Sequence, residues 1–254
     1  MNKNDFYDWV ESAKGDITKY DLCLKRKDYH TAIYHLQQTL EKTAKASMMA
    51  TSLSVPTQNP KPKILDALDL PVYYPKDYGH GWRKKFISQL GKINSNPNFT
   101  EIFDLYKSNG LKDTKSTILN AAEVKDLTNP TETEITQIIK NSDRVLSRNQ
   151  SKKFNSQLDK ALLEYRQDLD KVAKLTGSYM TVDDIMHLVK SYLKVTNVIV
   201  ALMLLSILLD PFEQNRYPEN LGNEKRFIPH FKQFKTILNC CIRILEREAS
   251  FWLD

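Results

Sequence analysis

Cysteine and glycine are scarce in this sequence, and their scarcity excludes several classes of protein. There are 3 cysteines in 254 residues, and the adjacent pair Cys240 and Cys241 gives neither zinc-ligand spacing nor an even-numbered disulfide framework. With 7 glycines the chain is not collagen-like, and with 41% hydrophobic and 27% charged residues it has the composition of an ordinary globular protein. The cysteine usage predicts a reducing, cytoplasmic setting.

Long hydrophobic runs are also missing. The first 16 residues lack the apolar core of a secretory signal. The most apolar stretch, Val195–Leu209, has 15 residues, whereas a membrane-spanning helix needs about 20. We interpret this stretch as the buried half of a long core helix and predict no membrane contact.

The sequence contains no Gly-rich phosphate loop, dinucleotide-binding fingerprint or nucleophile elbow. His35, His80 and His187 show no metal-like grouping with carboxylates at helical spacing. We therefore predict neither a cofactor nor a metal site.

Positive charge is concentrated in one segment. Residues 61–92 hold seven Lys or Arg against three Asp, which is +4 of the net +6. Aromatic residues are interleaved with these charges: Tyr73, Tyr74, Tyr78, Trp82 and Phe86. Such a mixture suits single-stranded nucleic acid, but it also fits a loop whose rings pack under the fold while its lysines stay hydrated.

Apolar residues recur at every third or fourth position, and strand-like alternation is almost absent. The spacing predicts helices over residues 6–24, 32–47, 154–172, 181–209 and 229–252, and Thr131 with Glu134 predicts a capping box. A loop rich in Pro and Gly separates the second helix from the rest. The prediction is an all-α fold, an antiparallel four- to five-helix up-and-down bundle.

Three pieces of the sequence resemble one family, the HEPN domain. They are Trp9-x3-Ala13-x2-Asp16-Ile17; Asp28-Tyr29-x2-Ala32 with Gln37-Gln38-x2-Glu41-Lys42-x2-Lys45-Ala46; and Arg216-Tyr217-Pro218. We accordingly assign residues 1–90 together with 180–254 to a HEPN-like bundle and residues 91–179 to an inserted helical lobe. The resemblance implies nucleotide or RNA handling, a homodimer, and in many members a nucleotidyltransferase partner in a toxin–antitoxin pair.

Many HEPN proteins are metal-independent endoribonucleases in which four to six residues lie between an Arg and the His that follows it. The motif is not met here: no His follows Arg216 at that spacing, and Arg226 and His230 have only three residues between them, as do Arg26 and His30. One missing residue turns a helical side chain by about 100°. His230 is either a surface or capping residue or half of a drifted catalytic pair with Arg226.

A second candidate site lies on the polar face of the second helix. Gln38, Glu41 and Lys45 share one side of that helix, and His35 is close enough in sequence to join them. In a HEPN-like arrangement Arg216 and Lys45 would donate to a phosphate, and Tyr217 would offer a stacking surface. The alternatives are a solvated face carrying a Glu–Lys pair, or an Arg216–Glu41 pair that holds the connection in place.

Three functions follow from this reading. The leading hypothesis is a HEPN-like module that binds a nucleotide or single-stranded RNA, without an intact ribonuclease motif. The second is an endoribonuclease toxin that uses Arg226 and His230. The third is a protein–protein partner of a nucleotidyltransferase with no ligand of its own.

Overall fold

The computed structural model describes residues 3–53, 130–164, 181–209 and 223–253, together with residues 166, 167, 170, 174 and 212. Every regular element within these ranges is a helix. The predicted all-α fold is confirmed.

The first two helices form a hairpin. α1 (Lys3–Lys25) and α2 (Tyr29–Leu53) are joined by a tight turn in which Lys27 has a positive φ of 59°. Asp28 caps α2, because its Oδ1 accepts a hydrogen bond from the backbone N–H of Thr31 at 3.1 Å. The apolar stripe of α1 is buried as predicted, from Phe6 to Tyr20.

The next described helices are α7 (Glu132–Ser147) and α8 (Lys152–Glu164), joined by the 3-10 turn η3 (Arg148–Gln150). The predicted capping box is confirmed: the hydroxyl of Thr131 accepts from the backbone N–H of Glu134, and the Glu134 carboxylate accepts from the backbone N–H of Thr131 at 2.7 Å. Thr131 therefore fixes the point where α7 begins.

α10 (Val182–Leu209) is the most buried helix of the bundle. By length and composition alone it could cross a membrane, but 89% of its most apolar window is buried inside the protein, and a core helix has the same character. Two 3-10 turns, η6 (Asn223–Arg226) and η7 (Ile228–His230), lead into the last helix, α11 (Phe231–Leu253).

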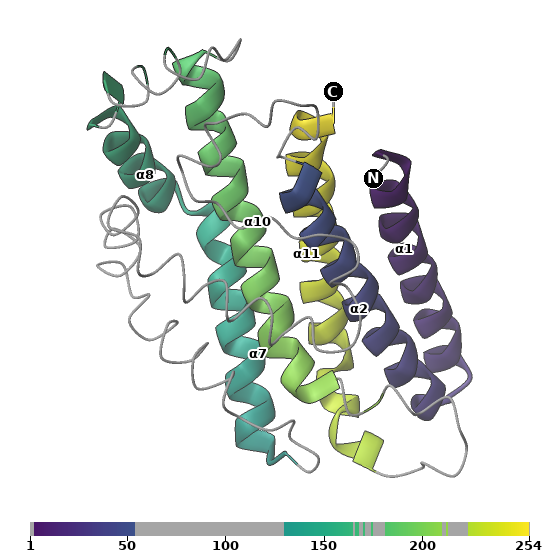
Figure 1. Cartoon of the computed structure of the whole chain (residues 1–254). Helices are drawn as coiled ribbons and strands as arrows, with labels where there is room; N and C mark the ends of the chain where they lie inside the picture. Colours follow the sequence, from purple (N-terminus) through teal and green to yellow (C-terminus); the bar gives the residue numbers. More distant parts are fainter. Residues whose placement is uncertain are drawn as a thin grey trace.

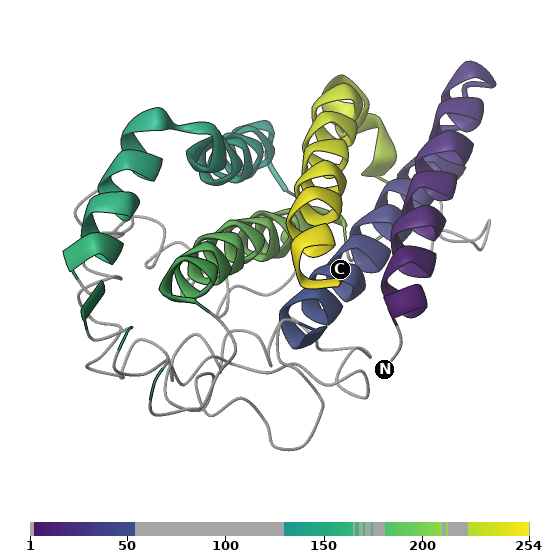
Figure 2. The ribbon, with the colours of Figure 1, turned by 90° about the horizontal axis from the view of Figure 1, so that it is seen from above.

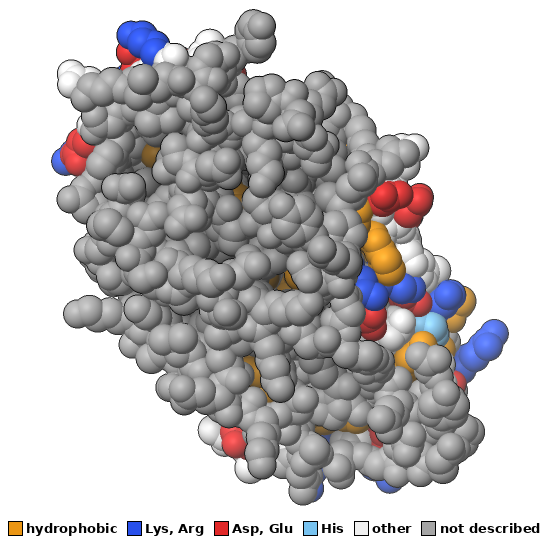
Figure 3. All heavy atoms as spheres, in the orientation of Figure 1, with side chains coloured by type: hydrophobic (Ala, Val, Ile, Leu, Met, Phe, Trp, Pro, Cys, Tyr) orange, Lys and Arg blue, Asp and Glu red, His pale blue; other side chains and the backbone are white. Residues whose placement is uncertain are grey.

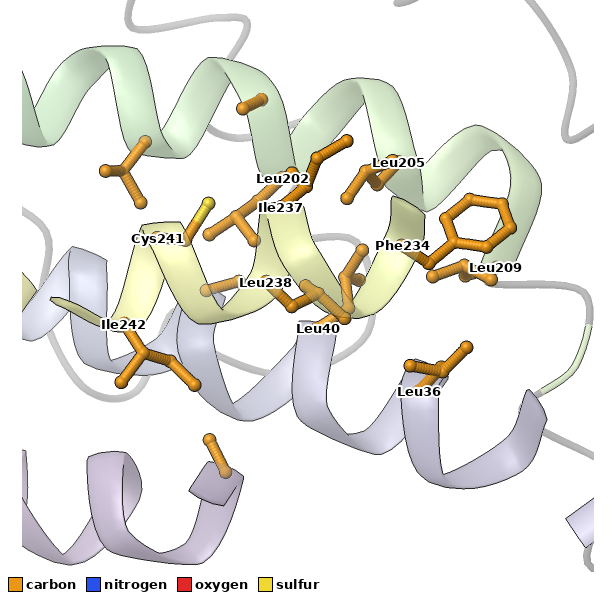
Figure 4. Close-up of a cluster of buried hydrophobic side chains, with 14 of the residues drawn as sticks. Leu36, Leu40, Leu202, Leu205, Leu209, Phe234, Ile237, Leu238, Cys241 and Ile242 are labelled. Atoms are coloured by element: carbon orange, nitrogen blue, oxygen red, sulfur yellow. The ribbon is translucent and has the colours of Figure 1, made fainter. Parts of the chain in front are cut away.

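Five helices share one hydrophobic core. α1 packs chiefly on α2, and α10 packs against α2, α7 and α11. Figures 1 and 2 show α1 and α8 at opposite edges of the molecule, with α11 beside both α2 and α10. In the centre, Leu238 of α11 lies between Leu40 of α2 and Leu202 of α10, and Phe234 of α11 lies beside Leu209 of α10 (Figure 4). Burying each such side chain contributes about 2 kcal/mol.

α7 belongs to this core although its residues fall within the range predicted as an inserted lobe. Ile135 and Leu146 of α7 are in the same buried cluster as Leu36 and Leu205. The predicted division at 90/91 and 179/180 falls outside the described residues and stays a prediction. The basic segment 61–92 also lies outside them.

Candidate functional site

A polar seam runs along the groove between α1 and α2 and is centred on the carboxylate of Asp16. Asp16 is only 3% exposed, although it is an acidic residue. It accepts a short hydrogen bond from Lys42 Nζ, and its Oδ1 lies 3.1 Å from His35 Nδ1. Lys19 Nζ is 3.7 Å away on the outer side. A carboxylate this buried is retained only when it is paired.

The Asp16 carboxylate also fixes the tautomer of His35. An ionised carboxylate can only accept, so Nδ1 of His35 carries the proton. Among the described residues no group bonds the other ring nitrogen, Nε2. Thr39, one turn along α2, donates its hydroxyl to the His35 carbonyl at 2.8 Å. Within the part of the chain that the structure describes, the imidazole is therefore held through Nδ1.

The predicted set on α2 continues the seam. Gln38 Nε2 donates to Glu41 Oε2 at 3.4 Å and to Gln37 Oε1 at 2.7 Å. Lys45 Nζ donates to Glu41 Oε1 at 2.6 Å and lies 4.7 Å from the centroid of the Trp9 ring. The structure brings Gln38, Glu41 and Lys45 together, as their spacing predicted.

The predicted Glu–Lys pair exists, but this face is not freely solvated. The side chains of Glu41 and Lys45 are 28% and 18% exposed, and Gln37 is buried. Partial burial strengthens charge interactions relative to bulk water. The face differs from the solvated alternative because α1 covers one side of it.

We define the α1–α2 seam by the eight residues that form this network: Trp9, Asp16, Lys19, His35, Gln38, Glu41, Lys42 and Lys45. Three ammonium groups in it face two carboxylates, which leaves a net positive charge. Figure 3 shows Lys, acidic and His side chains gathered on the side of the molecule where α1 and α2 lie. An ammonium has three donors, so lysines held by one carboxylate retain N–H groups that suit phosphate oxygens.

The second predicted pair, Arg226 and His230, lies in the 3-10 turns η6 and η7 that precede α11. His230 is 7% exposed, so the expectation of a surface residue is wrong. Its Nε2 lies 2.6 Å from Glu132 Oε1, and its Nδ1 lies 2.9 Å from Gln233 Oε1. Arg226 Nη1 donates to the Pro130 carbonyl at 3.5 Å. Both side chains therefore contact the start of α7.

The other Arg–His pair is arranged similarly. His30 Nδ1 lies 3.0 Å from Glu224 Oε1, and Glu224 is buried in η6. The connection before α11 is thus fastened to α2 through His30 and to α7 through Arg226 and His230.

Two further predictions and one property of a cysteine concern the rest of the chain. Arg216 and Tyr217 lie outside the described residues, so their predicted place beside α2 stays a prediction. Within the described ranges no group of three or more metal-ligating side chains occurs. Burial raises the pKa of the Cys241 thiol well above its ordinary value, which disfavours the reactive thiolate.

Asp16 and Lys42 belong to the sequence pieces that resemble the HEPN domain, but the sequence did not predict that they are part of the α1–α2 seam. A signal was present: Asp16 directly precedes Ile17 in a stripe of apolar residues that otherwise faces the core. A charged residue at such a position needs a partner. The spacing within one helix could not identify that partner, because Lys42 comes from the other helix of the hairpin.

These features define a class of protein, an all-helical bundle with a buried-carboxylate seam in its first hairpin. The family model of the HEPN domain matches residues 6–66, which include α1 from Phe6 onward, α2 and the whole seam. The predicted resemblance to the HEPN family is thereby confirmed over this segment, and it supports a nucleotide- or RNA-associated helical module. No curated protein and no solved structure matches the chain.

Proposed function

We propose that this protein is a nucleotide- or RNA-binding module that holds phosphate groups at the α1–α2 seam. The observation that carries the proposal is that Lys42 of α2 meets the buried carboxylate of Asp16 from α1, with Lys45 held beside it by Glu41, inside the HEPN-matched segment. The carboxylates fix the ammonium groups in position, so a phosphate meets donors that are already oriented. This reduces the entropy lost on binding.

The ring of Trp9 adds a second element to the site. Lys45 lies over it, and the indole supplies an aromatic surface beside the cation. Proteins that bind single strands combine cations along the backbone with aromatic side chains that stack on bases. The seam has one such pair, the Lys45 ammonium and the Trp9 ring. Arg216 and Tyr217 would add a second cation and a second ring.

The ribonuclease alternative receives less support. Both ring nitrogens of His230 contact Glu132 or Gln233, whereas a general base needs a nitrogen within reach of the proton it removes. We assign Arg226 and His230 the structural task of fastening η6, η7 and α7 together.

The proposal extends to the setting in which the module acts. We propose that it works in the cytoplasm as a homodimer, in a toxin–antitoxin or defence system, with a nucleotidyltransferase as its protein partner. An adjoining reading frame that encodes a small nucleotidyltransferase would support that partner, and co-purification of the two proteins would test it.

The direct test is a titration of the purified protein against fluorescent single-stranded RNA and against ATP at two salt concentrations. Saturable binding that weakens with salt, and that falls about five- to ten-fold in Lys45→Gln and in Arg216→Ala, supports the proposal. Lys153→Gln, an exposed lysine on α8, is the matched control and should bind like the wild type. Absence of binding to both ligands contradicts the proposal, and RNA that shortens during the titration favours the ribonuclease.

A further inference from the structure

A cleft of about 440 Å³ opens where α1, the start of α2, η7 and α11 meet. It shares no residue with the α1–α2 seam. Its volume falls in the range of about 300–1,000 Å³ that is typical of small-molecule sites. The proposed phosphate site does not account for this cleft.

Aromatic rings form much of the cleft wall. Tyr20 of α1, Tyr29 of α2 and Phe231 of α11 all line it. The Tyr20 and Phe231 rings meet edge to face with centroids 6.0 Å apart, and the Tyr29 ring lies 6.4 Å from that of Phe231. Three helices thus hold a rigid aromatic wall that suits another flat ring.

The hydroxyl of Tyr20 is a polar group in this wall. Tyr20 is 1% exposed, yet its hydroxyl makes no hydrogen bond to any residue in the described part of the chain. Burial, followed by the nearby charge of Asp21, raises the pKa of Tyr20, so the phenol stays protonated and can donate. The Tyr20 oxygen is not one of the buried polar atoms that lack a partner, so the hydroxyl reaches the cleft, where a ligand oxygen could accept its hydrogen bond.

Charge around the cleft favours an anion. Lys235 Nζ donates to both carboxylate oxygens of Asp21, at 2.7 and 2.6 Å, so these two charges compensate each other. Lys232 is exposed at the cleft, and none of the described acidic residues lies within ion-pair distance of its ammonium. The lining therefore carries one uncompensated positive charge.

We propose that this cleft is a binding site for a small aromatic anion. The flat ring of the ligand lies against the half-buried Tyr29, whose ring is next to the buried Phe231; Tyr20 donates a hydrogen bond to a ligand oxygen, and Lys232 provides the opposite charge. A neutral ring without the anionic group would gain nothing from the charge of Lys232. An anion without the ring would make no contact with the aromatic wall. Each should therefore bind more weakly than the intact ligand.

Phenyl phosphate is a suitable probe, with phenol and inorganic phosphate as its two halves. We expect calorimetry at low ionic strength to show saturable binding of phenyl phosphate, and each half to bind at least ten-fold more weakly. Tyr20→Phe removes only the hydroxyl and should weaken binding about five-fold. Lys232→Gln should weaken it about three- to ten-fold. The matched control is Lys140→Gln, an exposed lysine on α7, which should bind like the wild type.

Two further readouts keep the test decisive. Lys232 is exposed, so Lys232→Gln should unfold at the wild-type temperature, and a loss of binding in it cannot come from misfolding. RNA binding at the seam should be unchanged in Tyr20→Phe, which separates this site from the proposed function. Absence of saturable binding, equal binding by either half, or wild-type affinity in both cleft variants would overturn the proposal.

Discussion

Replacing Asp16 with Asn tests whether the buried carboxylate holds the α1–α2 hairpin together. The change keeps the shape of the side chain and removes its charge. Lys42, whose side chain is 20% exposed, would then lack its counter-charge, and His35 would face a neutral amide. Removing one member of a buried ion pair costs about 3–5 kcal/mol. Because Lys42 can still reach water, we expect a loss of about 2–3 kcal/mol in the free energy of unfolding.

Urea denaturation followed by circular dichroism measures this loss. With a slope of about 2 kcal/mol per molar urea, the midpoint should fall by about 1 M or slightly more. Asp8→Asn is the matched control, because Asp8 is exposed on the same helix. It should shift the midpoint by less than the equivalent of about 0.5 kcal/mol.

A double-mutant cycle attributes the effect to the pair. Lys42→Met keeps the aliphatic stem and removes the ammonium. The double variant Asp16→Asn/Lys42→Met should be more stable than the sum of the single effects predicts, with a coupling of about 1–2 kcal/mol. If Asp16→Asn behaves like Asp8→Asn, or if the two changes are additive, the buried pair does not stabilise the hairpin as we argue.

Three other predictions concern the rest of the bundle. Leu202→Ala removes a fully buried side chain and should cost about 3 kcal/mol by urea denaturation; a cost below about 1 kcal/mol would contradict the packing of α10. His230→Ala should lower stability through loss of its contact with Glu132 but leave labelled RNA intact and equally bound; loss of an RNA-cleaving activity in this variant would restore the ribonuclease hypothesis. Hydrogen bonds from the backbone N–H and hydroxyl of Thr131 lower the pKa of Glu134 below its ordinary value of 4.5. A carboxyl with a lowered folded pKa stabilises the fold above its unfolded pKa, and this stabilisation is lost as pH falls through the folded value. Thr131→Ala should therefore lower the melting temperature at pH 7 by an amount that shrinks between pH 5 and 3, and a pH-independent difference would refute this origin.

Much of the fold could be predicted because its signals are local. The period of the apolar residues in α1, α10 and α11 depends only on neighbours in sequence, and so do the caps at Asp28 and Thr131. These local patterns predicted the all-α bundle and most of the helix ends in the described ranges.

The candidate site was only partly predictable, because its partners come from different helices. Spacing placed Gln38, Glu41 and Lys45 on one face, but the Asp16–Lys42 pair depends on how α1 and α2 pack. The contact of His230 with Glu132 joins residues 98 positions apart, so its burial could not be anticipated from the residues beside it. The position of α7 in the core likewise depends on contacts between residues that are far apart in the sequence.

The most direct test of the phosphate site compares a substitution that removes a negative charge from the seam with one that removes a positive charge. Glu41→Gln keeps an acceptor oxygen that can still orient Lys45 and removes the negative charge that repels a phosphate, whereas Lys45→Gln removes the cation itself. The affinity for labelled single-stranded RNA, measured over a series of salt concentrations, should rise in Glu41→Gln and fall in Lys45→Gln. The slope of log Kobs against log salt should become less steep by about 0.7 in Lys45→Gln, the loss of one phosphate contact. Equal affinity and equal slope in the two variants and the wild type would contradict the account.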